Sequence, residues 1–258
     1  AEKFFDIKCR ASGLKPDAAL LVATVRAIKA HSGRFEITAG KPLPDGLGKE
    51  DLEALADGVG NLEKQIENVK QFGVPVVVAI NVFPTDTENE IEFLREKAIA
   101  AGASAAHVST MFAEGGKGGE DLAHALVAAC EEPSEFKLLY EDDASLKEKI
   151  EAIATKIYGA DGVDFEEEAD KQLAKFEENG FGKLPICMAK TQYSLSHDPL
   201  LKGRPTGFRF KVRDARVAVG AGFVYPLAGS IMTMPGLGKT PAGMNMDIDE
   251  NGDVVGML

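Results

Sequence analysis

Residues 74–87 have the sequence VPVVVAINVFPTDT, and this stretch decides the predicted fold. The run from Val74 to Ile80 is apolar and rich in β-branched residues. A strand that is wet on one face alternates apolar and polar residues, so an unbroken run indicates a strand buried on both faces, as in a parallel sheet. Thr87 and Glu90 have the spacing of a capping box, which predicts a helix from there to about Gly102. The stretch therefore predicts an α/β fold.

Polar groups and an aromatic ring directly follow this strand. Asn81 ends the apolar run, and Phe83 and Pro84 come next. Open α/β sheets bind their ligands at the carboxyl ends of their strands. We therefore expect the functional site at this edge of the sheet.

Composition excludes several classes of protein. The 258 residues are 45% hydrophobic and 27% charged, which is ordinary for a globular protein. They contain no apolar run of about eighteen residues, so we expect no membrane span. The net charge of −12 argues against a nucleic-acid-binding surface.

The 3 cysteines have no metal-binding spacing, which fits a reducing cytoplasm and predicts no metal site. The first residues include neither an initiator Met nor a signal peptide, so we expect the chain to begin within a larger protein.

The chain divides into three predicted units. Residues 1–56 have one buried strand, within 18–25, and resemble the tail of an α/β unit. Because one strand cannot form a sheet, it either pairs with strands after residue 60 or has its neighbours outside the chain. Residues 57–158 are predicted as repeated βα units. Residues 159–258 are predicted as a small α+β domain with mostly antiparallel strands and a hairpin that turns at Asn251–Gly252.

Two aromatic residues are expected at the same edge of the sheet. If the strands that begin near Val74 and Ala103 are parallel neighbours, Phe83 and Phe112 emerge together and can hold a flat heterocycle between them. The alternative is that both rings pack against neighbouring helices, since buried Phe is the commoner case. The glycine-rich segment 115–119 opens a helix and is either an anion site or a surface loop.

Other patterns carry less weight. Gly236–Thr240 ends like a phosphate-binding loop but lacks the required earlier glycine, because Thr233 stands there. Asp247–Gly252 opens like a calcium loop, yet its twelfth position is Leu258 instead of Glu. The four histidines are scattered, and the basic row Arg209, Lys211 and Arg213 is typical of a solvated strand face that can also meet an acidic substrate tail.

Long runs of this sequence closely resemble the C-terminal part of formate–tetrahydrofolate ligase, also called 10-formyltetrahydrofolate synthetase. They are Ala1–Arg10, Val22–Ala27, Asn81–Thr87, Leu184–Ser196, Gly220–Phe223 and Ile231–Leu237. The resemblance implies the fold: the end of a P-loop NTPase-like parallel-sheet domain (1–56), a βα domain that contributes to the folate site (57–158) and a smaller α+β C-terminal domain (159–258).

The resemblance also implies the chemistry. The family forms 10-formyltetrahydrofolate from formate, ATP and tetrahydrofolate through formyl phosphate. ATP with Mg²⁺ is then a substrate, and no tightly bound cofactor is expected. The family's P-loop lies upstream of the matched segment, so no catalytic residue is expected in this chain, which would be inactive without the N-terminal half. The expected assembly is a homo-oligomer, a tetramer in the family, in the cytoplasm.

Site residues are carried over by matching motifs. The family holds folate between aromatic residues, which correspond here to Phe83, with Pro84 beside it, and to Phe112. The second position is usually Trp in the family, and this chain has no Trp. Candidates for the cleft or the nucleotide site are Phe4, Phe5, Asn81 and Asp86. The alternative function is a non-catalytic folate-binding or regulatory module that lacks the ATPase half.

Overall fold

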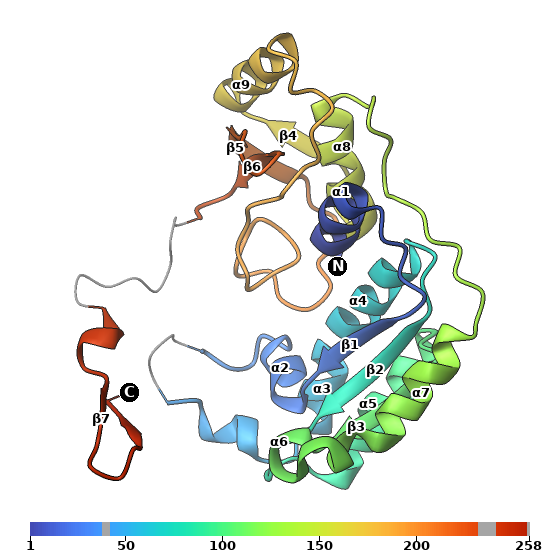
Figure 1. Cartoon of the computed structure of the whole chain (residues 1–258), viewed down its shortest axis with the longest axis vertical. Coiled ribbons are helices and arrows are strands. Elements are labelled where there is room, and N and C mark those ends of the chain that lie inside the picture. Colours follow the sequence, from blue (N-terminus) through green and yellow to red (C-terminus); the bar gives the residue numbers. More distant parts are fainter. Residues whose placement is uncertain (38–41, 232–240, 257–258) are drawn as a thin grey trace.

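The computed structural model describes residues 1–37, 42–231 and 241–256. Two sheets with their helices form its main body, and a small hairpin lies near the C-terminus (Figure 1). The elements around the first sheet are η1 (Lys3–Cys9), α1 (Arg10–Ser12), β1 (Ala19–Ala23), α2 (Val25–Ala30), η2 (Asp45–Gly48), α3 (Leu52–Gly58), α4 (Gly60–Lys70), β2 (Val76–Asn81), α5 (Glu88–Ala100), β3 (Ala105–Ser109), α6 (Met111–Glu114), η3 (Gly115–Gly119) and α7 (Glu120–Cys130). The later elements are α8 (Leu146–Ala152), η4 (Ile153–Ile157), β4 (Val163–Phe165), α9 (Glu167–Glu178), β5 (Phe210–Ala218), β6 (Phe223–Ala228), η5 (Ala242–Met244), β7 (Asp247–Ile248) and β8 (Val254–Val255).

The first sheet is parallel, with the strand order β1-β2-β3. Leu21 of β1 pairs with Val78 of β2, which pairs with Ala106 of β3. The strand within residues 1–56 therefore pairs with strands after residue 60, which was the first of the two predicted alternatives. The prediction that this strand is buried is wrong in part, because Leu20 and Val22 are exposed and only Ala23 is buried.

Strand β2 is buried on both faces, as its apolar run predicts. Val76, Val78 and Ile80 belong to the main core, with residues from α4 and α5. Val77 and Ala79 face the other way and pack against α7 in a smaller cluster. Figure 1 shows α7 lying along this sheet. Helices on both faces are what a parallel sheet requires.

Local capping sets where the helices begin. Thr87 caps α5, and both hydrogen bonds of the predicted capping box with Glu90 are present. The strand predicted over 18–25 ends earlier, at Ala23, because the Thr24 hydroxyl accepts a hydrogen bond from the Ala27 amide and begins α2. An apolar run does not reveal this change from strand to helix.

The second sheet has the order β4-β5-β6 and is mixed. Strands β5 and β6 are antiparallel, but β4 runs parallel to β5. The connection from β4 to β5 passes through α9 and a long segment, which is enough chain for a parallel crossover. The predicted hairpin is confirmed: β7 and β8 are antiparallel and Gly252 has a φ of 86°. The P-loop-like segment Gly236–Thr240 lies outside the described residues.

One continuous hydrophobic core extends under both sheets. It joins Val78 of β2 and Phe72 to Ile150 of α8 and Phe210 of β5. The division into units 1–56, 57–158 and 159–258 stays a prediction. Among the described residues, each helix is too short or too polar to cross a bilayer.

A buried ion pair fastens α2 to α5. Lys29 Nζ lies 2.5 Å from Glu90 Oε1, and both side chains are almost fully buried. Lys29 also donates to the carbonyl oxygens of Leu47 and Lys49, at 3.3 and 2.6 Å. Glu90 accepts from the Asp51 amide at 3.0 Å. The pair therefore holds the segment around η2 and the start of α3 as well as the two helices.

A second buried carboxylate holds η1. Asp6 is fully buried, accepts from the Leu139 amide at 2.9 Å and pairs with Arg10. Its other oxygen, Oδ2, has no hydrogen-bond partner within the part of the chain that the structure describes. Burial raises the pKa of Asp6 to about 6, and the Leu139 amide and Arg10 oppose this shift only in part.

We expect Lys29→Met to lower the free energy of unfolding by roughly 3–5 kcal/mol, because it leaves the Glu90 carboxylate buried without its cation. Urea denaturation followed by circular dichroism measures this. The matched control is Lys171→Met, which breaks an exposed pair with Glu167 and should cost less than about 1 kcal/mol. Equal effects of the two substitutions would contradict the assigned role of the buried pair.

We expect the stability of the wild type to fall relative to Asp6→Asn as the pH rises from about 4 to about 7. A carboxyl pKa raised on folding means that the folded state binds the proton more tightly, so this stabilisation is complete below the unfolded pKa and is lost as the pH rises through about 6. The relative loss approaches about 3 kcal/mol. Urea denaturation of both proteins at several pH values measures it, and a constant difference would rule out the shift.

Candidate functional site

Three segments meet at the carboxyl edge of the first sheet. Each begins where a strand ends: at Thr24 after β1, at Asn81 on β2 and at Ser109 on β3. Asn81 and Ser109 are register partners, and the Val82 amide donates to the Ser109 carbonyl at 3.3 Å. In Figure 1 the arrows of β1 and β2 point toward this edge, where α2 and α6 lie. The parallel order thus brings together the two strand ends on which Phe83 and Phe112 were predicted.

Phe83 is held in a tight turn. The Asp86 amide donates to the Phe83 carbonyl at 2.9 Å, and the Phe83 amide donates to Asp86 Oδ2 at 2.9 Å. Burial raises the pKa of Asp86, while the hydrogen bond from Phe83 opposes the shift. Asp86 therefore positions the backbone that presents Phe83.

A cation covers one face of the Phe83 ring. The Arg26 guanidinium carbon lies 3.7 Å from the ring centroid, within the range of a cation–π contact. Arg26 comes from the first turn of α2, just after β1. Phe83 itself is half-buried, so its ring is not lost in the core. The site thus contains an aromatic ring, that of Phe83, with one face covered by Arg26.

Phe112 is the most exposed large apolar residue among those described, with a relative exposure of 102%. It lies on α6, a helix of 4 residues. The described ring pairs do not include Phe83 with Phe112, so these two rings do not stack on each other. A free aromatic side chain at a sheet edge is available to a ligand.

The glycine-rich segment folds back onto the start of α6. It forms the 3-10 helix η3 ahead of α7, and the Thr110 amide donates to the Gly118 carbonyl at 3.0 Å. A Cβ at Gly118 would lie 2.6 Å from the Thr110 carbonyl carbon. This close approach fixes the position of α6 and with it Phe112. Whether the segment binds an anion stays a prediction.

The remaining candidates are dispersed. Asn81 lies at the edge with Phe83, but Phe4 and Phe5 lie beside β1, where they line a separate cavity with Leu20 and Leu21. Phe5 is buried and stacked on Phe72, with 4.5 Å between ring centroids, so it packs in the core. Phe4 is 44% exposed. The structure does not group these two rings with Phe83 and Phe112.

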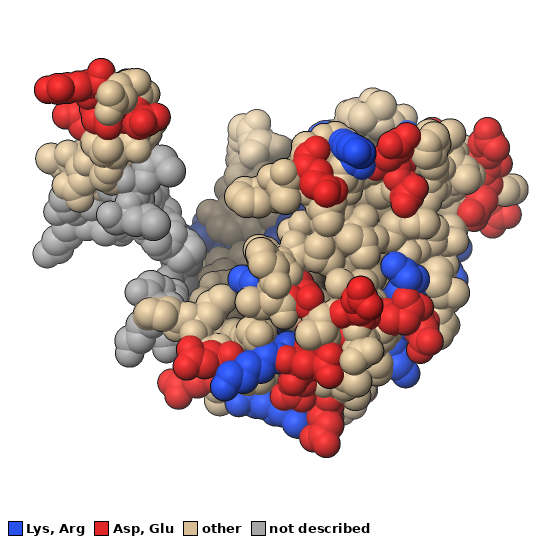
Figure 2. Space-filling model, turned by 90° about the horizontal axis from the view of Figure 1, so that it is seen from below, with Lys and Arg blue, Asp and Glu red and all other residues tan. Residues whose placement is uncertain are grey.

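Sequence reasoning missed Arg26 and Thr110. Thr110 directly follows β3, and Arg26 lies in the first turn of α2, shortly after β1. A position just past the end of a strand, which Phe83 shares, was the available signal. Neither side chain's partner could be read from the sequence, since Arg26 meets Phe83 only in the folded sheet. The described residues include no group of His, Cys, Asp and Glu side chains that could hold a metal ion. Figure 2 shows this end of the molecule, where acidic side chains cover more of the surface than basic ones.

Comparisons with known proteins agree with the resemblance seen in the sequence. The family model described as formate–tetrahydrofolate ligase matches residues 1–258. A formate–tetrahydrofolate ligase of Roseiflexus sp. (strain RS-1) is 59% identical over 256 residues, which are 99% of this chain and 45% of that protein. One from Desulforamulus reducens is 54% identical, over 100% of this chain and 45% of that protein. The cytoplasmic C-1-tetrahydrofolate synthase of Schizosaccharomyces pombe is 53% identical, over 99% of this chain and 27% of that protein. The chain thus spans less than half the length of these relatives.

We expect Gly118→Ala to destabilise the protein by roughly 1–3 kcal/mol, because the added methyl group collides with the Thr110 backbone. The matched control is Gly116→Ala in the same segment, where a Cβ meets nothing within 4 Å. Thermal and urea denaturation of both variants measure the difference. If the two variants are equally stable, the contact between Gly118 and Thr110 does not fix α6.

Proposed function

This chain belongs to the formate–tetrahydrofolate ligase family, and from that premise we propose that the carboxyl edge of its first sheet binds the tetrahydrofolate substrate. The main support is the position of Phe83 and Phe112 at the ends of two neighbouring parallel strands. Asn81, at the end of β2, and Pro84, next to Phe83, belong to the same proposed site. The proposal makes this chain the folate-binding part of the longer enzyme.

The proposed binding mode is stacking. The pterin ring of the folate is flat, and a stack of a heterocycle on an aromatic side chain contributes about 1–3 kcal/mol. Arg26 already occupies one face of Phe83, so the pterin would use the other face or displace the guanidinium. Phe112 offers a second ring, with less stacking area than the Trp found at this position in the family. Asp86 acts as a positioning residue through its hydrogen bond with the Phe83 amide.

The proposed reaction is that of the family. The γ-phosphoryl group of ATP passes to a formate oxygen, which gives formyl phosphate and ADP. N10 of tetrahydrofolate then attacks the formyl carbon. The C–N bond forms, the C–O bond to the phosphoryl group breaks and N10 loses its proton, so that the products are 10-formyltetrahydrofolate and inorganic phosphate. The described and matched residues carry no phosphate-binding loop with its lysine, so we place the Mg²⁺-ATP phosphates on the part of the enzyme outside this chain. Assembly into a homo-oligomer belongs to the same proposal.

In the complete enzyme, we expect Phe83→Ala to weaken tetrahydrofolate binding by roughly 1–3 kcal/mol, because one stack is lost. ATP affinity should stay near the wild-type value, since the nucleotide is proposed to bind elsewhere. Phe112→Ala should act in the same direction, and Phe112→Trp should bind folate at least as tightly as the wild type. Fluorescence or calorimetric titration with each ligand measures these affinities.

The matched control is Phe223→Ala, which removes a similarly half-buried ring from β6 in the second sheet. This variant should leave folate affinity unchanged. If Phe83→Ala lowers stability but leaves folate binding intact, Phe83 is a packing residue and the proposed site is wrong. If the variants bind folate as expected but the complete protein shows no ATP-dependent product, the alternative of a non-catalytic folate-binding module is supported.

A further inference from the structure

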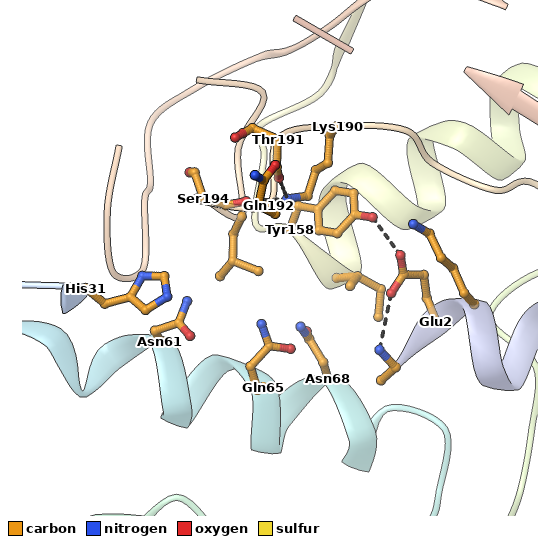
Figure 3. A pocket seen from close by; sticks show the side chains of 14 residues that line it. Glu2, His31, Asn61, Gln65, Asn68, Tyr158, Lys190, Thr191, Gln192 and Ser194 are labelled. Atoms are coloured by element: carbon orange, nitrogen blue, oxygen red, sulfur yellow. Dashed lines mark hydrogen bonds and ion pairs between the residues drawn. The ribbon is translucent and has the colours of Figure 1, made fainter. Parts of the chain in front are cut away.

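A polar cavity lies away from the proposed folate site. It has a volume of about 320 Å³ and lies between α4 and the segment 190–195, with Tyr158 and the N-terminal residues at its side (Figure 3). Neither Phe83 nor Phe112 lines it. Any ligand of this cavity is therefore separate from the folate that we propose for the sheet edge.

One side of the cavity is a row of amide side chains. Asn61, Gln65 and Asn68 are spaced so that they share one face of α4, and Figure 3 shows all three pointing into the cavity. Asn61 donates to the Gly203 carbonyl at 3.1 Å. Leu62, Ile66 and Val69 of the same helix supply its contact with the core, whereas Asn61 and Gln65 are half-buried and Asn68 is buried.

Asn68 is the most informative of these residues. Its relative exposure is 1%, and neither its amide nitrogen nor its amide oxygen has a hydrogen-bond partner among the described residues. A buried amide without partners costs free energy, so natural proteins almost always supply them. The Asn68 side chain therefore indicates a partner that fills the cavity with both an acceptor and a donor.

The opposite side of the cavity carries a cation. Lys190 Nζ donates to the carbonyl oxygens of Thr191, at 2.9 Å, and Ser194. An ammonium group has three donors, so one is left over. Among the described residues, the ion pairs do not include Lys190. Burial lowers its pKa to about 8, which leaves it mostly charged at neutral pH.

One carboxylate in the cavity wall, that of Glu2, offsets this cation only in part. It accepts a hydrogen bond from the Tyr158 hydroxyl at 2.7 Å, and it acts on Lys190 through space without forming one of the described ion pairs with it. Lys3 and His31 also line the cavity and add no negative charge. The Lys190 ammonium group also lies 5.1 Å from the centroid of the Tyr158 ring. An anion in the cavity would therefore meet an ammonium group that has no carboxylate partner among the described ion pairs, together with amide N–H donors.

We propose that this cavity binds a small molecule through a phosphate or carboxylate group, with Lys190 providing the charge and the Asn68 and Gln65 amides donating hydrogen bonds. A phosphate group that carries one proton fits best, because its O–H can donate to the Asn68 amide oxygen while its other oxygens accept. A carboxylate satisfies only the donors. The site would be a second ligand site of this protein.

The test is calorimetric titration of the 258-residue chain with inorganic phosphate and, separately, with acetate. We expect saturable phosphate binding with one site per chain, and weaker acetate binding. Lys190→Met and Asn68→Leu should each weaken phosphate binding at least about tenfold. The matched control is Lys171→Met on the exposed face of α9, which should titrate like the wild type.

A second measurement keeps the test independent of how the variants fold. In the wild type, phosphate should shift the side-chain amide resonances of Asn68 and Gln65 in ¹H–¹⁵N spectra, while that of the exposed Asn89 should stay in place. A wild type without saturable binding and without these shifts overturns the proposal and indicates that only water fills the cavity. Equal weakening by Lys190→Met and Lys171→Met overturns it as well, because the binding would then reflect overall charge.

Discussion

Strand β2 is buried along both faces and paired along both edges, and the rest of the first sheet depends on this. Its backbone hydrogen bonds go to β1 and β3, and its side chains pack against α4 and α5 on one face and α7 on the other. Such a strand can present polar groups only at its ends. That constraint explains why Asn81 and Phe83 stand at the edge, and why the neighbouring strands bring Arg26 and Phe112 to the same place.

Much of this arrangement could be predicted because its causes are local in the sequence. The unbroken run before Asn81 identifies a strand buried on both faces, and the capping box at Thr87 fixes the start of the next helix. Asn251–Gly252 supplies the backbone conformation that the hairpin needs. The end of β1 was missed because Thr24 starts a helix inside an apolar run, and capping takes precedence over periodicity there.

The rest could not be predicted because it depends on residues far apart in the sequence. No local pattern joins Lys29 to Glu90, or the Arg26 guanidinium to the Phe83 ring. The parallel pairing of β4 with β5 is equally hidden, because alternation along β5 shows which face is wet but not the direction of its neighbour. Asn68 stands between Glu67 and Val69 as an ordinary helix residue, and only the fold shows that its amide is buried and has no partner in the described parts of the chain. Of the candidate site, the ring positions were predictable and their surroundings were not.

The pairing order of the first sheet also governs how this part of the chain can fold during synthesis. Ribosomes deliver β1 well before β2, yet among the described strands β1 pairs only with β2. Pairing two parallel strands of this kind closes a large loop, which lowers the conformational entropy of the chain. This cost arises before the strands gain any free energy from their contacts. Helix α4 can form before β1 has paired, because the backbone hydrogen bonds of a helix are local. The backbone hydrogen-bonding groups of β1 therefore lack their partner strand until residues 76–81 emerge, and in this interval they are open to contacts with other chains.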